Sequence, residues 1–193
     1  MPRYKEYDID VVLDKALNLF WLKGYNQTSL ADLVEVTGLK KGSLYSEFSS
    51  KEELYKKALS SYRLKTIQNF FTTEENPRNY LKNFFSRLID EALDSETSKG
   101  CFILNSNIEF CSSNCDLSHI SKKLFIEIEN NFFNVVKDLV RLKYLDKSID
   151  QDEFHSLVIG CIFSIREMSR FKQDRKFLTN LANGVLKYIG DEI

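Results

Sequence analysis

The sequence predicts an all-α fold of about nine helices. Apolar residues recur at helical spacing in nearly every segment of the 193-residue chain. No segment shows the sustained alternation of apolar and polar residues that marks a β-strand. Capping residues such as Ser, Asp, Asn and Gly stand between the apolar stretches, where helices are expected to begin and end.

The first two helices are bounded by residues with a clear capping role. An apolar stripe over residues 9–20 marks the first helix, and Gly24 is expected to end it. Thr28 or Ser29 can cap the second helix, because a hydroxyl oxygen accepts a hydrogen bond from the free amides of the first turn. Gly38 interrupts this helix after about two turns.

A short third helix and a long fourth one follow. The third covers residues 40–48, and its Leu44 and Phe48 lie one turn apart, so both face inward. Ser50 opens the fourth helix, which is expected to cover residues 50–72 and to connect two parts of the chain. The domain boundaries expected from this pattern are 1–49 for an N-terminal domain and 50–193 for a C-terminal one.

Five more helices are expected after a break at residues 72–77. Each of their stretches carries apolar residues at helical spacing. Pro77, Cys101 and Asp150 mark the starts of three of them, and the apolar residues of the other two run from Leu124 to Leu139 and from Phe177 to Leu186. The last two are too apolar for a helix with one solvated side, so we expect them to cover each other in a homodimer. The dimer interface is assigned to Phe154, Leu157, Val158, Cys161, Ile165, Leu181 and Val185.

The composition indicates which kinds of partner and location are expected for the protein. The whole chain carries 27 Lys and Arg against 28 Asp and Glu, whereas its first 65 residues carry 11 against 9. This nearly neutral balance argues against a protein that binds nucleic acid over its whole surface, but it is compatible with a local basic patch. Neither a targeting segment nor an apolar run of about 20 residues is visible, so a cytoplasmic protein without a membrane partner is expected.

The short helices on either side of Gly38 predict a helix-turn-helix. Helices of this length are unstable alone, so they must pack on their neighbours, which leaves the polar side of the third helix free for double-stranded DNA. The residues assigned to DNA contact are Thr28, Ser29, Lys40, Lys41, Gly42, Ser43, Tyr45, Ser46 and Lys51. Glu47 can accept a hydrogen bond from a cytosine amino group or point away from DNA.

These motifs resemble the N-terminal region of TetR/AcrR-family regulators. The resemblance is carried by Gly24-Tyr25, Thr28 to Leu33, Thr37 to Tyr45, Phe48, Ser50-Lys51 and Leu54-Tyr55. It implies a three-helix DNA-binding domain joined by a long fourth helix to a ligand-binding and dimer-forming domain, and hence a repressor. Val34 departs from the small residue that many members have at that position.

The resemblance extends to the C-terminal part of the chain. The run from Gly100 to Asn105 is similar to a motif that opens the sixth helix, beside the ligand pocket, in one branch of the family. Gly160 with Ile165-Arg166 is similar to an eighth-helix pattern in which a small residue allows close approach across a dimer. An unknown small-molecule inducer, partly apolar, is expected to contact Phe84, Phe85, Cys101, Phe102 and Asn105.

The same sequence allows other functions. Cys101 is either a thiol that senses oxidants or electrophiles, or a buried cysteine, and the second reading is favoured. Cys111, Cys115 and His119 have a spacing that suits a metal on one helix, but a helix break is expected there, so no metal and no cofactor are expected. No catalytic motif is present, which argues against an enzyme. A dimeric interaction module without DNA binding is the third class.

Overall fold

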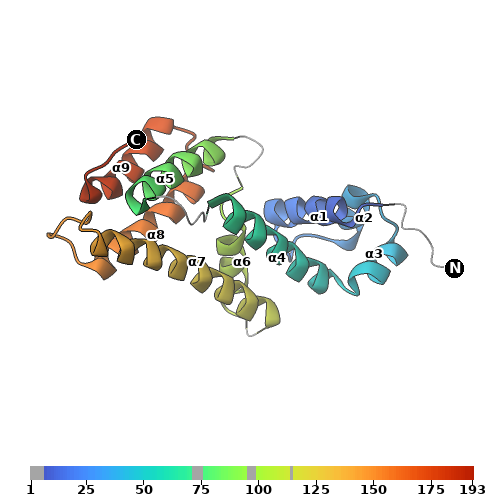
Figure 1. The fold of residues 1–193 in the computed structure, drawn as a ribbon. Coiled ribbons are helices and arrows are strands. Elements are labelled where there is room, and N and C mark those ends of the chain that lie inside the picture. Colours follow the sequence, from blue (N-terminus) through green and yellow to red (C-terminus); the bar gives the residue numbers. More distant parts are fainter. Residues whose placement is uncertain (1–6, 71–75, 95–98, 114) are drawn as a thin grey trace. The chain divides into compact units, whose positions relative to one another are not determined.

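The computed structural model describes residues 7–70, 76–94, 99–113 and 115–193 (Figure 1). Within these residues the chain forms nine α-helices and one 3₁₀ turn, with no β-strand, which confirms the all-α prediction. The helices are α1 (Ile9–Lys23), α2 (Leu30–Thr37), α3 (Lys41–Phe48), α4 (Lys51–Phe70), α5 (Pro77–Leu93), α6 (Phe102–Phe110), α7 (Asp116–Arg141), α8 (Gln151–Met168) and α9 (Arg175–Leu186). Among them, none is long and apolar enough to span a membrane.

Several helices begin where the sequence predicts a cap. The Ser29 side chain accepts a hydrogen bond from the amide of Asp32 at the start of α2. Asn76 caps α5, whose first residue is Pro77. Asp150 accepts from two amides at the start of α8. Local side-chain chemistry therefore sets these boundaries. The predicted end of the fourth helix at residue 72 lies outside the described residues.

The chain divides into two compact units. Unit 1 comprises Met1–Gln68 and Asn105–Leu124, and unit 2 comprises Asn69–Leu104 and Phe125–Ile193. Unit 1 is therefore discontinuous in sequence: α6 begins in unit 2 and ends in unit 1, and α7 begins in unit 1 and ends in unit 2. The boundary between residues 49 and 50 expected from the sequence stays a prediction.

The core of unit 1 centres on Tyr55 of α4. Its side chain is 1% exposed, and its ring makes an edge contact with Phe20 of α1, at 4.9 Å between centroids. Tyr25, in the turn after α1, lies 5.1 Å from Tyr55, and Phe110 at the end of α6 lies 5.8 Å from it. Four aromatic rings from three helices and a turn thus meet in one cluster, which fixes the end of α6 against the other helices of this unit.

The core of unit 2 is built from α5, α7, α8 and α9. These helices bury a continuous apolar cluster in which Leu81, Phe85, Phe154 and Leu178 are almost completely covered. The Arg166 guanidinium, also largely buried, donates to Glu91 at 2.9 Å, which compensates for burial of its charge. Unit 2 therefore has its own packed interior.

Candidate nucleic-acid interface

The exposed face of α3 carries most of the residues predicted to contact DNA. Leu44 and Phe48 are 3% and 2% exposed, so they fix the helix from its inner side, as predicted. Lys40, Lys41, Gly42, Tyr45 and Ser46 are exposed on the other side, and Ser43 is half-buried. The side chains of Lys40, Lys41, Tyr45 and Ser46 make no hydrogen bond or ion pair within the described part of the chain. They are therefore available to a ligand outside the chain.

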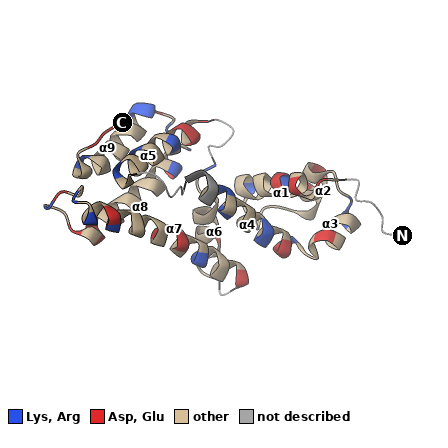
Figure 2. Cartoon of the chain, viewed as in Figure 1, with Lys and Arg blue, Asp and Glu red and all other residues tan. Residues whose placement is uncertain are grey.

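Positive charge at α3 is concentrated at its first turn. Figure 2 shows Lys residues at the start of α3 and both signs of charge along α4. Glu47, whose role the sequence left open, accepts a hydrogen bond from the Tyr7 hydroxyl at 3.1 Å. The two adjacent lysines, Lys40 and Lys41, make this end of α3 suited to phosphate.

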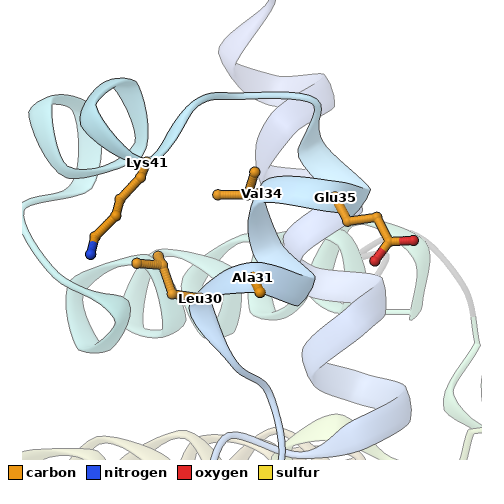
Figure 3. Close-up of a pocket in the computed structure, with 5 residues that line it drawn as sticks. All are labelled: Leu30, Ala31, Val34, Glu35 and Lys41. Atoms are coloured by element: carbon orange, nitrogen blue, oxygen red, sulfur yellow. The ribbon is translucent and has the colours of Figure 1, made fainter.

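An open hollow lies between α2 and α3. It is lined by Leu30, Ala31, Val34, Glu35 and Lys41. Figure 3 shows Val34 and Lys41 on facing sides of the hollow, with Glu35 pointing away from Lys41. Val34 is larger than the residue that many TetR-family members have at this position. It lies at a partly open surface rather than in a closed contact between the two helices.

The start of α2 is a closed capping box. Ser29 accepts from the Asp32 amide at 3.1 Å, and the Ser29 amide donates to the Asp32 carboxylate at 2.8 Å. The Lys23 ammonium also donates to Asp32, at 2.9 Å. The hydrogen bond from Lys23, followed by those from Ser29, lowers the pKa of Asp32 to about 2. The box therefore holds the exposed Ser29 at a defined position.

Thr28 and Lys51, two other predicted DNA contacts, have partners inside unit 1. The Thr28 side chain is buried and its hydroxyl donates to the Gly24 carbonyl at 2.6 Å. The Lys51 ammonium donates to the carbonyls of Tyr25 and Thr28, both at 2.9 Å. Both residues thus organise the turn between α1 and α2. Their assignment as phosphate contacts stays a prediction.

The same turn receives a carboxylate that sequence reasoning missed. Glu109 of α6 accepts hydrogen bonds from the amides of Tyr25, at 2.9 Å, and Asn26, at 2.7 Å. Gly24, with φ of 82°, lies so close that a Cβ there would be 3.1 Å from a Glu109 oxygen. A contact across more than 80 residues has no local sequence pattern, and only the run Gly24-Tyr25 marks the place.

The residues predicted to bind an inducer are mostly buried. Phe84 and Phe85 lie in the core of unit 2, where the Phe84 ring is 4.8 Å from that of Phe132. Cys101 and Phe102, at the start of α6, are also buried, and Asn105 is half-buried. Their assignment to a ligand stays a prediction.

The structure explains why a glycine precedes Cys101. The Cys101 amide donates to the Glu167 carboxylate at 3.1 Å. Gly100, with φ of 77°, lies so close to Glu167 that an added Cβ would overlap a carboxylate oxygen. Any side chain at Gly100 would therefore clash with the carboxylate of α8 that holds the start of α6.

The residues assigned to the dimer interface fall into two groups. Leu157 is 43% exposed and Leu181 is half-buried. The other members lie in the core of unit 2, namely Phe154, Val158, Cys161, Ile165 and Val185. The exposed row on α8 is formed instead by Glu153, Leu157, Gly160, Ser164 and Met168. The interface assignment itself stays a prediction.

Two cysteines lie on the turn between α6 and α7. Cys111 and Cys115 are exposed, and the helix break predicted between them is confirmed. A hydrogen bond with Ser113, at 3.2 Å, is the main cause that lowers the pKa of the Cys115 thiol, and amides of the first turn of α7 add to it. Among the described residues, no group of three metal-ligating side chains is suitably arranged to hold an ion.

Comparison with known proteins places the N-terminal part of the chain in a family. Residues 12–58 match the family model described as "Bacterial regulatory proteins, tetR family". The HTH-type transcriptional repressor ComR of Escherichia coli (strain K12) is 36% identical over 124 residues, which are 62% of this chain. The match spans 59% of the length of ComR.

Solved structures share the fold over nearly the whole chain. A TetR transcriptional regulator from Chloroflexus aurantiacus has a TM-score of 0.81 and 23% identity, with 95% of this chain and 94% of that chain covered. The TetR-family regulator CifR, solved with a 26bp double-strand operator DNA, has a TM-score of 0.76 and 20% identity, with coverage of 96% and 98%. Residues 12–58 therefore match the tetR family model, and the chain shares its fold with these solved TetR-family regulators.

Proposed function

We propose that this protein is a transcriptional repressor that binds a pseudo-palindromic DNA operator as a homodimer and is released by an inducer. The observation that carries the proposal is the exposed face of α3, with Lys40, Lys41, Tyr45 and Ser46 directed away from a buried Leu44 and Phe48. A helix fixed from one side and polar on the other can enter a major groove without distortion of its own packing. Repression at the chromosome implies that the protein acts in the cytoplasm.

The related proteins support this reading. ComR is named as a transcriptional repressor, and CifR has been solved with operator DNA. In our proposal Lys40 and Lys41 contact phosphates, Gly42 lets the backbone approach closely, and Tyr45 reaches a phosphate oxygen. Ser43 and Ser46 lie on the side that meets base edges, so they set the preference between sites.

The proposed dimer uses α8 and α9. The exposed row on α8 has Leu157 and Met168 as apolar members, with Gly160 between them. An added Cβ at Gly160 would meet no atom within 4 Å in this chain, so the row is open to a partner helix. Such a two-fold dimer sets two α3 helices about 34 Å apart, one turn of DNA.

The proposed inducer acts through unit 2. The predicted contacts with it are aromatic and apolar, which favours a partly apolar molecule. Binding weakens the operator complex only if the inducer prefers a state in which the two α3 helices no longer match the operator, and such coupling commonly amounts to ~1 to 3 kcal/mol. In this mechanism α4, which leads from α3 toward unit 2, moves the DNA-binding residues.

A thiol switch is the second candidate function. Cys101, the thiol proposed from the sequence, is buried, whereas Cys115 is exposed and its pKa is lowered by hydrogen bonds. A lower pKa raises the thiolate fraction at neutral pH, and the thiolate is the form that reacts with oxidants and electrophiles. If the chain senses them, we expect Cys115 to be the reacting residue.

Selection of duplexes from a random DNA pool tests these functions. We expect the purified protein to enrich a palindrome, and the Lys41→Ala variant to bind the enriched duplex more weakly. Failure to enrich any duplex at low salt, with the dimer intact, would contradict the proposal and favour an interaction module. Repeating the selection with diamide tests the thiol switch, since loss of binding that Cys115→Ser prevents would support it.

A further inference from the structure

We propose that Glu109 is a positioning residue for DNA binding: its carboxylate, carried at the end of α6, holds the turn between α1 and α2 in the conformation that presents the start of α2. This inference rests on the proposed function, because it concerns how the DNA-binding face is held. In this inference α6 supports the DNA-binding residues in addition to α4, which follows α3 directly in the chain. Every contact it uses lies within unit 1.

Glu109 satisfies two backbone donors at once. Its two oxygens accept separately from the amides of Tyr25 and Asn26, at 2.9 and 2.7 Å. Both amides follow the end of α1, where no helical carbonyl serves as their acceptor. Hydrogen bonds to an ionised carboxylate are stronger than those between neutral groups. Loss of the carboxylate would therefore leave two donors of this turn without their protein acceptor.

Lys51 and Phe110 also hold the turn. The Lys51 ammonium donates to the Tyr25 carbonyl and lies 4.1 Å from the centre of the Tyr25 ring. The Phe110 ring, next to Glu109 in sequence, lies 5.7 Å from that of Tyr25. The amide, the carbonyl and the ring of Tyr25 are thus each held by a different side chain. Three residues further on, Thr28 and Ser29 begin the DNA-facing end of α2.

The beginning of α6 is fixed by a contact of the same chemistry. There the Glu167 carboxylate of α8 accepts from the Cys101 amide, within unit 2. The nine-residue helix α6 therefore has a contact between a carboxylate and an amide at each end. At its start the carboxylate belongs to Glu167 of α8, and at its end the carboxylate is that of its own Glu109. The adjoining Gly24 and Gly100 both have positive φ and leave room for these carboxylates.

Charge and geometry make opposite predictions for substitutions at Glu109, which gives a sharp test. Removal of a negative charge from a DNA-binding unit should by itself tighten DNA binding. If Glu109 acts by position, Glu109→Gln instead weakens binding of the selected operator, by about threefold, since one amide oxygen can replace only one of two acceptors. Glu109→Asp keeps the charge but is too short to reach both amides, and we expect about a tenfold loss, equivalent to ~1.4 kcal/mol.

Asp116→Asn is the matched control. Asp116 belongs to the same unit and is 75% exposed, and among the described residues its side chain has a single ion-pair partner, Lys56, at 3.4 Å. We expect this variant to bind the operator as tightly as the wild type or more tightly. Affinity for a non-operator duplex should fall by a similar factor in the Glu109 variants, because Thr28 and Ser29 at the displaced start of α2 are assigned to phosphates. General unfolding is recognised separately, by loss of exchange protection at the Phe48 amide.

Hydrogen exchange tests, in the absence of DNA, whether Glu109 holds the two amides. We expect the amides of Tyr25 and Asn26 to exchange faster in Glu109→Asp, while that of Phe48 in α3 keeps its protection. Unchanged operator affinity in both Glu109 variants would overturn the inference and leave the proposed function intact. If the wild type binds no duplex, the proposed function fails, and the exchange of the two amides alone decides whether Glu109 holds the turn.

Discussion

Tyr45 of α3 is more exposed than the aromatic side chains in the core of unit 1. It is 43% exposed, whereas Phe20, Phe48 and Tyr55 are almost completely buried. Tyr45 lies one turn from Lys41 on this short helix, and much of its side chain remains open to a ligand. Its role in our proposal is to contact the DNA backbone.

We expect Tyr45→Ala to weaken binding to operator and non-operator duplexes alike, by about tenfold, because phosphate contacts carry no sequence information. Lys41→Ala should lower the slope of log affinity against log salt by about one. Both are measured by fluorescence anisotropy at several salt concentrations. Lys147→Ala, an exposed lysine of unit 2, is the control and should leave slope and affinity unchanged.

The four cysteines should differ in reactivity. Burial raises the pKa of Cys161 to about 12, whereas hydrogen bonds lower the pKa of Cys115. We expect iodoacetamide at pH 7 to label Cys115 first and to leave Cys161 unlabelled in the folded protein. Cys111, exposed on the same turn, controls for access. Mass spectrometry of the peptides would contradict this order if Cys161 were labelled as fast as Cys115.

At the scale of elements, the cap of α2 links pH to the stability of the DNA-binding helices. The pKa of Asp32 is lowered from 3.8 to about 2, so its ionised form stabilises the folded state above pH 3.8, and this contribution is lost as the pH falls toward 2. We expect Asp32→Asn to lower the melting temperature at pH 6 and to approach the wild type near pH 2. A constant difference across this range would contradict the assignment. Glu35→Gln, on the exposed side of the same helix, is the control.

Helix boundaries were largely predictable because they depend on neighbouring residues. Ser29, Asn76 and Asp150 cap helices as expected, and the exposed side of α3 follows from the inward direction of Leu44 and Phe48. Contacts over long sequence distances were not predictable. The hydrogen bonds that Glu109 accepts from backbone amides, and those that Lys51 donates to backbone carbonyls, leave no periodic pattern. Apolar spacing alone also cannot separate a face that fills the core from one that meets a partner.

At the scale of the whole molecule, the proposed dimer makes α8 the decisive surface. We expect Leu157→Asp to convert dimers to monomers in sedimentation velocity, because it places a charge in the centre of an apolar contact. Loss of the dimer should also weaken operator binding, since each monomer then holds only one half-site. Val140→Asp is the control, as Val140 is 41% exposed on α7. A Leu157→Asp protein that remains dimeric would rule out this interface.

The discontinuity of unit 1 limits how its N-terminal helices can be transplanted into another protein. Residues 1–68 alone lack Phe110, Leu117 and Leu124, which are buried in the complete unit, and they also lack Glu109. A chimera that joins the first 50 or 70 residues to a foreign domain therefore inherits α3 without the segment that completes the core around it. Such a fusion would need a host whose own sixth and seventh helices present an aromatic ring and a carboxylate at the matching place, so the N-terminal helices of this chain cannot be exchanged alone.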